Sequence, residues 1–196
     1  MDDEAREAAE VMTRYCAGEP AAFHRLYALL APRILAYLCG LIGEKATAED
    51  LLQQTFLKVH EARSAYVRGA NPIPWVYTIA HRTCLDEIRR RKRSRVRLSN
   101  DGTLAAEPVA DLTGGSAESR SEPVERGDAA SAAMAALERL PGNQREALIL
   151  TKVHGRSHAE AAMITGTTPG AIKLRAHRAY VSLRQMLGSR REKKLA

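Results

Sequence analysis

Arginine and lysine side chains gather at two separated places in this sequence, residues 82–97 and residues 173–194. Guanidinium and ammonium groups pair with phosphate, so both stretches have the composition of a surface that binds a polyanion. The first stretch follows Trp75, and aromatic and arginine side chains together favour stacking on unpaired bases. The second stretch contains Lys173, Arg175 and Arg178 at a spacing that suits a helix lying in a DNA groove. The sequence therefore favours binding of nucleic acid at two points.

The overall composition agrees with an anionic partner and with a reducing compartment. The chain has 196 residues and a formal net charge of +7. Its three cysteines, Cys16, Cys39 and Cys84, are odd in number and widely spaced, which argues against a disulfide framework or a zinc knuckle. The first residues do not resemble a signal peptide, and no apolar stretch is expected to span a bilayer. We therefore predict a soluble cytoplasmic protein with no membrane insertion of its own.

The elements that must position these basic groups are predicted to be helices. Between residues 4 and 95, apolar residues recur three and four positions apart without strand alternation, which predicts about four helices. The turns are expected at Gly18 with Pro20, Gly40 with Gly43, and Gly69 with Pro72 and Pro74. This part of the chain is predicted to be a compact helical domain.

A change in composition separates this domain from the next. Residues 98–128 are rich in Gly, Ser, Pro, Ala and acidic residues and contain few large apolar residues. Such a segment cannot bury enough apolar surface to fold alone, so it is predicted to be a flexible acidic linker, and a simple tether explains it as well as any specific role. We predict an all-α chain with two small helical domains, residues 1–97 and residues 129–196, joined by this linker.

The second domain carries the signals of a helix-turn-helix. Ser157 and Glu160 have the spacing of a capping box, and Gly166 is expected to form the turn. Thr168 is then placed to cap a second helix that begins at Pro169. This second helix is the one that enters the major groove in helix-turn-helix proteins.

The outer side of that second helix supplies the candidate DNA contacts. Ile172, Ala176 and Ala179 share one side and are expected to pack inward. Hydroxyls and free backbone N–H groups at the helix start suit phosphate, and long basic side chains can reach base edges. The candidates are Thr167, Thr168, Lys173, Leu174, Arg175 and Arg178. A solvated basic helix in a small bundle is the alternative explanation for the same residues.

A helix over residues 48–60 is predicted to present a different kind of surface. One face carries a core stripe formed by Ala48, Leu51, Leu52, Thr55 and Val59. The opposite face carries Asp50, Gln53, Gln54 and Leu57, and a leucine centred in a polar face suggests a docking surface for another protein. Chance exposure of one leucine explains the same pattern.

The segment before and through the first basic stretch has the residues needed to grip single-stranded DNA. A loop at residues 66–73 could surround a flipped base and read its edge, and the following helix adds an aromatic ring and arginines. The candidates are Tyr66, Arg68, Asn71, Trp75, Arg82, Arg89, Arg90 and Lys92. Trp75 could equally be a core anchor, so both roles remain open for it.

No catalytic or metal-binding pattern accompanies these surfaces. The sequence lacks a phosphate-binding glycine loop, a nucleophile paired with a base, and metal-ligand spacing among its six histidines. We predict that the chain is not an enzyme and uses no cofactor or metal.

Four stretches together resemble the extracytoplasmic-function sigma factors of the sigma-70 family. They are AEDLLQQTFLKVH, WVYTIAHRTCLDEIRRRKR, LERLPGNQREALILTKVHGRSHAEAA and GTTPGAIKLRAHRAYVSLRQML. They occur in the family's order across both predicted domains, so the resemblance is more specific than a helix-turn-helix alone. The resemblance implies that the first domain corresponds to sigma region 2 and the second to sigma region 4.

The resemblance also implies a role for each surface. Glu49, Asp50, Gln53, Gln54 and Leu57 match the family's surface for the clamp helices of core RNA polymerase. The loop at residues 66–73 and the helix after it match the part that melts and reads the promoter's minus-ten element. Residues 173–178 match the positions that contact the minus-thirty-five element. The family further implies control by an anti-sigma factor.

Two other functions are compatible with parts of the sequence. A helix-turn-helix regulator acting without polymerase would explain the second domain, but it leaves the docking helix and residues 75–93 without a role. A sigma-like decoy that captures an anti-sigma factor would not need the basic side chains, yet these are present at both places.

Overall fold

The computed structural model describes residues 3–99 and 135–193, and all regular elements within these ranges are helical. Apart from a helical stretch at residues 135–138, they are in chain order α1 (Asp3–Cys16), α2 (Pro20–Ile42), α3 (Lys45–Glu61), the short 3-10 helix η1 (Ala62–Ala65), α4 (Pro72–Ser99), α6 (Gly142–Leu148), the π turn η2 (Ile149–Val153), α7 (His158–Thr165) and α8 (Pro169–Lys193). The predicted all-α fold class is confirmed. Most of the predicted linker, residues 98–128, lies outside the described ranges.

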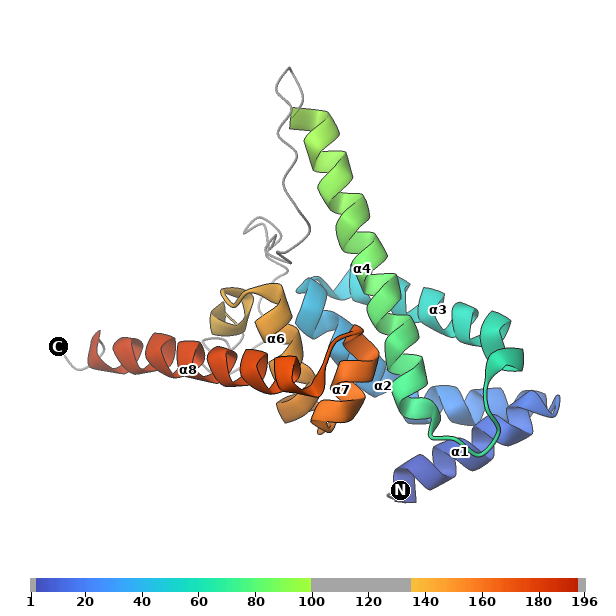
Figure 1. Ribbon diagram of the computed structural model, residues 1–196. Helices are drawn as coiled ribbons and strands as arrows, with labels where there is room; N and C mark the ends of the chain where they lie inside the picture. Colours follow the sequence, from blue (N-terminus) through green and yellow to red (C-terminus); the bar gives the residue numbers. More distant parts are fainter. Residues whose placement is uncertain (1–2, 100–134, 194–196) are drawn as a thin grey trace.

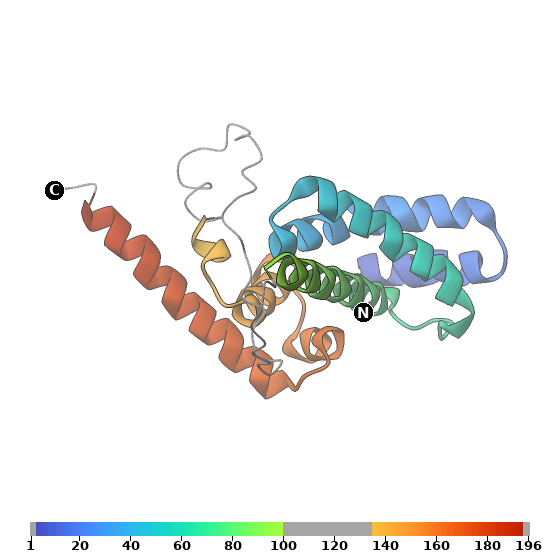
Figure 2. The same ribbon diagram turned by 90° about the horizontal axis from the view of Figure 1, so that it is seen from above.

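Helix α2 lies at the centre of the first part of the chain, residues 3–99. It packs against α1, α3 and α4, and its C-terminal end also meets α6 (Figures 1 and 2). Leu26, Leu30 and Ile34 follow each other at helical spacing and are buried. The helix ends where Gly43 adopts a left-handed conformation with a φ of 78°. The turn expected at Gly40 with Gly43 is therefore present at Gly43, whereas Gly40 lies inside α2, which continues to Ile42.

Helix α2 also corrects the expectation that no stretch could span a bilayer. Its length of 23 residues and its mean hydropathy of 1.4 satisfy the length and composition of a membrane-crossing helix. Its contacts with four other helices give a sufficient reason for this composition. A helix at the centre of a bundle must be apolar on several sides.

The second part, residues 135–193, forms the predicted helix-turn-helix. The Ser157 hydroxyl accepts a hydrogen bond from the backbone N–H of Glu160, and the Glu160 carboxylate accepts one from the backbone N–H of Ser157, so the capping box is confirmed. Gly166 adopts the left-handed conformation that ends α7. The Thr168 hydroxyl then accepts a hydrogen bond from the backbone N–H of Ala171 and caps α8, as predicted.

Loss of the capping box should lower the stability of the second part. Ser157→Ala removes the side-chain acceptor for a backbone N–H at the start of α7, which typically costs about 1 kcal/mol. We expect the urea midpoint of the full chain to fall, with the helical signal in circular dichroism unchanged before the transition. An unchanged midpoint would mean that solvent replaces this cap without cost.

The two parts of the chain pack directly against each other. Helix α7 lies against α4, and α6 lies against the end of α2, as both ribbon views show (Figures 1 and 2). Buried residues of the second part, such as Leu150 and Ile164, belong to the same core cluster as Tyr37 and Val76 of the first part. One continuous apolar core therefore joins two parts that the sequence predicts as separate domains.

Candidate nucleic-acid and protein-docking surfaces

Helix α3 presents the polar face that its sequence predicts. The five residues of its core stripe, Ala48, Leu51, Leu52, Thr55 and Val59, are all buried. On the other side, a group that we call the docking face is exposed; it consists of Glu49, Asp50, Gln53, Gln54 and Leu57. The Leu57 side chain is 58% exposed, although it is one of the larger apolar residues of the first part. An exposed leucine framed by carboxylates and amides is typical of a surface that a protein partner covers.

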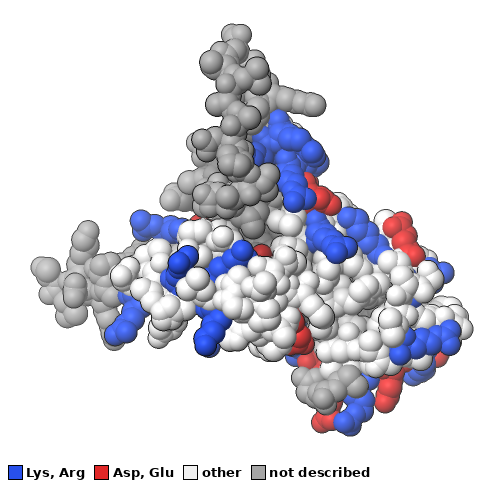
Figure 3. Space-filling model, in the orientation of Figure 1, with Lys and Arg blue, Asp and Glu red and all other residues white. Residues whose placement is uncertain are grey.

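Helix α4 carries the first basic surface along the part that projects from the body. Figure 3 shows Lys and Arg side chains along this projecting part. Arg82, Arg89 and Lys92 are exposed. Arg90 is also exposed, but its guanidinium donates two hydrogen bonds to the Glu87 carboxylate, at 2.7 and 2.8 Å. These hydrogen bonds hold the pKa of Glu87 below its usual range, so the carboxylate is ionised and offsets part of the positive charge.

The loop before α4 is more ordered than the sequence suggests. Tyr66 is buried, and its hydroxyl donates to the backbone carbonyl of Ala70. The Asn71 side chain accepts a hydrogen bond from the backbone N–H of Ile73 at 3.0 Å and so caps α4. Arg68 is exposed. Tyr66 and Asn71 therefore make hydrogen bonds that order the loop. Of these three side chains, Arg68 is the exposed one that can reach a ligand.

Trp75 is partly a core residue and partly exposed. Its ring is half-buried, packs against the core cluster and lies 5.8 Å from the Tyr66 ring, centroid to centroid. Val67 follows Tyr66 in the sequence, and 73% of its surface is exposed. Sequence reasoning did not identify this exposed apolar residue. The Tyr66 and Trp75 rings thus pack together at the base of the loop, and the Trp75 side chain stays partly accessible to solvent.

The second basic surface lies at the start of α8. Ile172, Ala176 and Ala179 are buried as predicted. Of the six candidates, Thr168, Lys173, Leu174 and Arg178 are exposed, while Thr167 and Arg175 are half-buried. Helix α8 begins immediately after the turn at Gly166, with its first turn facing solvent. This is the arrangement in which a helix start can meet base edges and phosphates.

The structure also brings together residues that sequence reasoning did not identify. Tyr37 from α2, His81 from α4 and Glu146 from α6 meet in the core. The Tyr37 and Glu146 partners lie 109 residues apart in the chain. Glu146 follows the polar residues Asn143, Gln144 and Arg145 in α6, and nothing in that short sequence identifies its partners.

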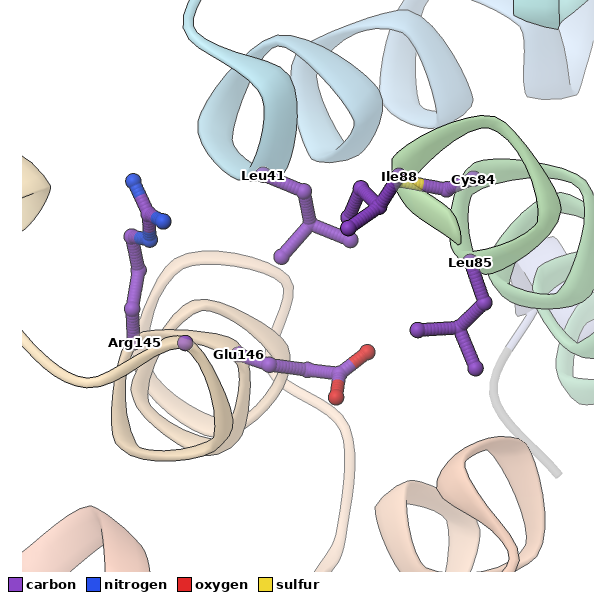
Figure 4. A pocket seen from close by; sticks show the side chains of 7 residues that line it. Leu41, Cys84, Leu85, Ile88, Arg145 and Glu146 are labelled. Carbon is purple, nitrogen blue, oxygen red and sulfur yellow. The ribbon is translucent and has the colours of Figure 1, made fainter. Parts of the chain in front are cut away.

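A small cavity lies beside this cluster, between α2, α4 and α6 (Figure 4). Its volume of about 20 Å³ is enough for a single water molecule. Cys84 lines it, and burial raises the pKa of its thiol to about 12, so the thiol stays protonated and unreactive. Arg145 also lines it, and its buried Nε has no hydrogen-bond partner among the described residues. The cavity is too small for a cofactor.

His154 is a second histidine between the two parts, and it is half-buried. Its Nδ1 lies 3.0 Å from the Tyr77 hydroxyl, and its ring meets the Tyr37 ring edge to face at 5.9 Å. Burial, with Arg156 and Arg33 nearby, lowers the pKa of His154 from 6.5 to about 4. The imidazole is therefore neutral in the folded chain at neutral pH.

This lowered pKa predicts that mild acid destabilises the fold. In the unfolded chain the imidazole takes up a proton near pH 6.5, whereas in the folded chain it does so only near pH 4. The contribution of neutral His154 is therefore complete above about pH 6.5 and is lost as the pH falls toward 4. We expect the urea midpoint to fall more between pH 7.5 and pH 5 for the wild type than for His154→Gln. Equal losses in both proteins would contradict this assignment.

Among residues 3–99 and 135–193, no group of three or more His, Cys, Asp or Glu side chains is placed to hold a metal ion. The exposed surfaces described above are one polar face with an exposed leucine on α3 and two basic surfaces on α4 and α8.

Comparison with known proteins gives matches over both parts. The model of the family "Sigma-70 region 2" matches residues 26–94, and that of "Sigma-70, region 4" matches residues 131–183. The RNA polymerase sigma factor CarQ of Myxococcus xanthus is 38% identical over 177 residues, which cover 90% of this chain and 95% of CarQ. The ECF RNA polymerase sigma factor SigM of Mycobacterium tuberculosis is 30% identical over 93% of this chain and 86% of its own.

A solved structure agrees with these matches. The sigma factor RpoE of Bartonella quintana, in complex with the anti-sigma factor NepR, superposes with a TM-score of 0.65 at 28% sequence identity. The similarity covers 85% of this chain and 96% of that one. It therefore extends over both helical parts.

Proposed function

The chain belongs to the extracytoplasmic-function sigma factors of the sigma-70 family, and from this premise we propose how its surfaces direct core RNA polymerase to promoters and start transcription. The observation that carries the proposal is the presence, in one chain, of an exposed docking face on α3 and two exposed basic surfaces, on α4 and α8. A protein that recruits an enzyme to two DNA elements needs these three surfaces.

We assign the docking face to core polymerase. Leu57 offers apolar area at the centre, and Asp50 and Gln53 offer polar groups around it. Such a pattern, with an apolar anchor and a polar rim, suits a stable protein interface. The corresponding surface in the family docks on the clamp helices of the polymerase's largest subunit.

We assign the α4 surface and the loop before it to the minus-ten element. Arg82, Arg89 and Lys92 are exposed for phosphate contact, and Trp75 with Tyr66 offers aromatic surface for an unstacked base. Because Tyr66 is buried against Trp75, the loop must shift to admit a base between them. The α8 surface, with Lys173 and Arg178 exposed near its start, is assigned to the minus-thirty-five duplex.

We further propose that an anti-sigma protein controls this chain. The support is the similarity to the Bartonella quintana sigma factor, whose structure contains such a protein. In this proposal the chain acts in the cytoplasm together with polymerase and performs no catalysis itself. The exposed basic side chains on α4 and α8 argue against a decoy that never meets DNA.

The proposal is tested by DNA binding with and without polymerase. Labelled genomic fragments are mixed with the chain alone, with core polymerase alone and with both. We expect specific retention on selected fragments only when both are present. Selective binding by the chain alone, at equal strength without polymerase, would instead indicate a helix-turn-helix regulator.

A further inference from the structure

We propose that Arg91 is a positioning residue that ties helix α4 to the start of α3, and so fixes the direction in which α4 presents its DNA-binding side chains. Arg91 does not itself contact DNA, although it lies in the middle of the basic run formed by residues 89–93. The claim rests on the proposed function, because it assigns a role beside the minus-ten surface.

Arg91 differs from the other basic side chains of this run in its exposure. Its side chain is 37% exposed, whereas those of Arg89 and Arg90 are 60% and 68% exposed. Lys92 and Arg93 are exposed as well. Of the five residues, Arg91 is therefore the one that turns toward the body of the protein.

The Arg91 guanidinium donates hydrogen bonds to three acceptors. Its Nε donates to Glu87 Oε1 at 2.8 Å, one turn back on α4. Its Nη2 donates to Glu44 Oε2 at 3.0 Å and also to the Thr47 hydroxyl. Glu44 directly precedes α3 and Thr47 lies in its first turn, 47 and 44 residues away in the chain. One side chain thus joins α4 to the start of α3.

The two acceptors at the start of α3 are themselves fixed. The Thr47 hydroxyl accepts from Arg91 and donates to the Glu44 carboxylate at 2.8 Å. The hydrogen bonds from Thr47 and Arg91 hold the pKa of Glu44 below its usual range, so this carboxylate is ionised at neutral pH. The Glu44 side chain makes no capping hydrogen bond to α3. It serves the contact with α4 instead.

The charges of this network cancel. Four side chains take part in its ion pairs, namely Arg90, Arg91, Glu44 and Glu87. Two positive and two negative charges leave no net charge to attract phosphate. A phosphate that took Arg91 would also leave the Glu44 carboxylate without its cation. Lys92, the next residue, is exposed and takes no part in the network, so it is the better phosphate ligand.

Arg91 is placed where α4 leaves the body. Closer to the start of α4, a second polar contact joins the same two helices, because Lys58 Nζ donates to the Thr83 hydroxyl at 3.2 Å. Beyond Arg91 the helix continues to Ser99 and projects from the rest of the chain (Figure 1). Among the described hydrogen bonds between α3 and α4, those of Arg91 therefore lie nearest the projecting end.

A small tilt of α4 at this point would displace the projecting part. The helix from Arg91 to Ser99 is about 12 Å long, so a tilt of about 10° moves its far end by about 2 Å. Hydrogen bonds tolerate only about 0.5 Å. Because the docking face lies on α3, the direction of α4 relative to α3 is also its direction relative to bound polymerase. Arg91 thereby sets where the basic side chains meet the minus-ten element.

The first experiment measures promoter opening by the full chain with core polymerase, on a genomic fragment where the wild type starts transcription. Polymerase is saturated with each variant, and permanganate reactivity of unpaired thymines gives the rate of open-complex formation. We expect Arg91→Gln to lower this rate about three- to tenfold, with co-purification of polymerase unchanged. Arg91→Lys should recover only part of the loss, because one ammonium group cannot reproduce the planar fork of a guanidinium.

The decisive variant is Glu44→Gln, because the two roles of Arg91 predict opposite results. If Arg91 gripped DNA, loss of the neighbouring negative charge would free it and speed opening. If Arg91 positions α4, the loss loosens the contact and slows opening about as much as Arg91→Gln does. Combining the two changes should then slow opening no further, whereas combining Glu44→Gln with Lys92→Gln should multiply their effects.

The matched control is Glu19→Gln. It removes the carboxylate partner of Arg14, which donates to Glu19 through two nitrogens in a pair away from α3 and α4. This variant should open promoters at the wild-type rate.

Salt dependence supplies a readout that a positioning role does not move. Each side chain that neutralises a phosphate adds about one to the slope of log affinity against log salt concentration. For binding of the polymerase complex to the promoter, Lys92→Gln should reduce this slope by about one, and Arg91→Gln should leave it unchanged. An equal reduction in both variants would make Arg91 a DNA contact and overturn the proposal.

The remaining outcomes separate this inference from the proposed function. Opening that is unchanged or faster in Glu44→Gln, with polymerase still bound, would overturn the positioning role while the function stands. If circular dichroism shows that Arg91→Gln is unfolded, Arg91→Lys and Glu44→Gln decide the same question. A wild type that gives no transcript on any fragment would defeat the proposed function, and the role of Arg91 with it.

Discussion

Replacing Leu57 with arginine is expected to abolish binding to core RNA polymerase while leaving the fold intact. Leu57 is 58% exposed at the centre of the docking face, so a charged side chain there meets solvent in the free chain. In the complex the same arginine would bring an unpaired charge into an apolar contact. Loss of a central anchor typically costs about 2 to 4 kcal/mol, a thirtyfold to thousandfold loss of affinity. Co-purification with core polymerase and a binding titration measure the effect.

The matched control is Val153→Arg, which adds the same charge at an apolar residue of the second part. Val153 is 65% exposed and belongs to η2, away from α3 in the chain. This variant should bind polymerase as the wild type does. Retention of polymerase by Leu57→Arg, with an unchanged circular dichroism spectrum, would remove α3 from the interface.

Loss of either exposed basic residue at the start of α8 should weaken promoter discrimination. Lys173 and Arg178 are exposed on the outer side of the helix whose inner side carries Ile172 and Ala176. A basic side chain at a base edge contributes about 1 to 3 kcal/mol of discrimination, so each change to alanine should reduce it roughly fivefold to 150-fold. Competition between promoter and unrelated duplex in the presence of core polymerase measures the ratio directly.

Arg184→Ala is the control for this pair. Arg184 is exposed on the same helix but lies about three turns further from its start than Lys173. It should lower affinity for all sequences slightly and leave the ratio unchanged. Unchanged promoter choice in both Lys173→Ala and Arg178→Ala would contradict the assignment of the minus-thirty-five surface.

Local signals in the sequence predicted most of the helices. The capping box at Ser157, the turn at Gly166 and the cap at Thr168 are short-range patterns, and each is present as expected. The core stripe and the exposed Leu57 of α3 also follow from helical periodicity alone. The turn predicted at Gly40 with Gly43 occurs at Gly43, whereas Gly40 lies inside α2 with the Ile149 side chain against it.

The contacts between distant segments could not be predicted in this way. Glu146 sits in a helix whose sequence gives no indication of Tyr37 and His81, which are far away in the chain. Similarly, the sequence suggests that Tyr66 is a loop residue that contacts DNA. Only the fold reveals that Tyr66 is buried with its ring against Trp75. The residue assignments of the three surfaces remain predictions until variants are measured.

Run-off transcription tests the central claim most directly. Purified core polymerase is incubated with fragments of the organism's own genome, with and without this chain. We predict new transcripts that start at discrete sites, and that share sequence elements about 10 and 35 base pairs upstream, only when the chain is present. No new transcript, from a chain that is folded and in excess over an active polymerase, would contradict its role as a promoter-specificity subunit.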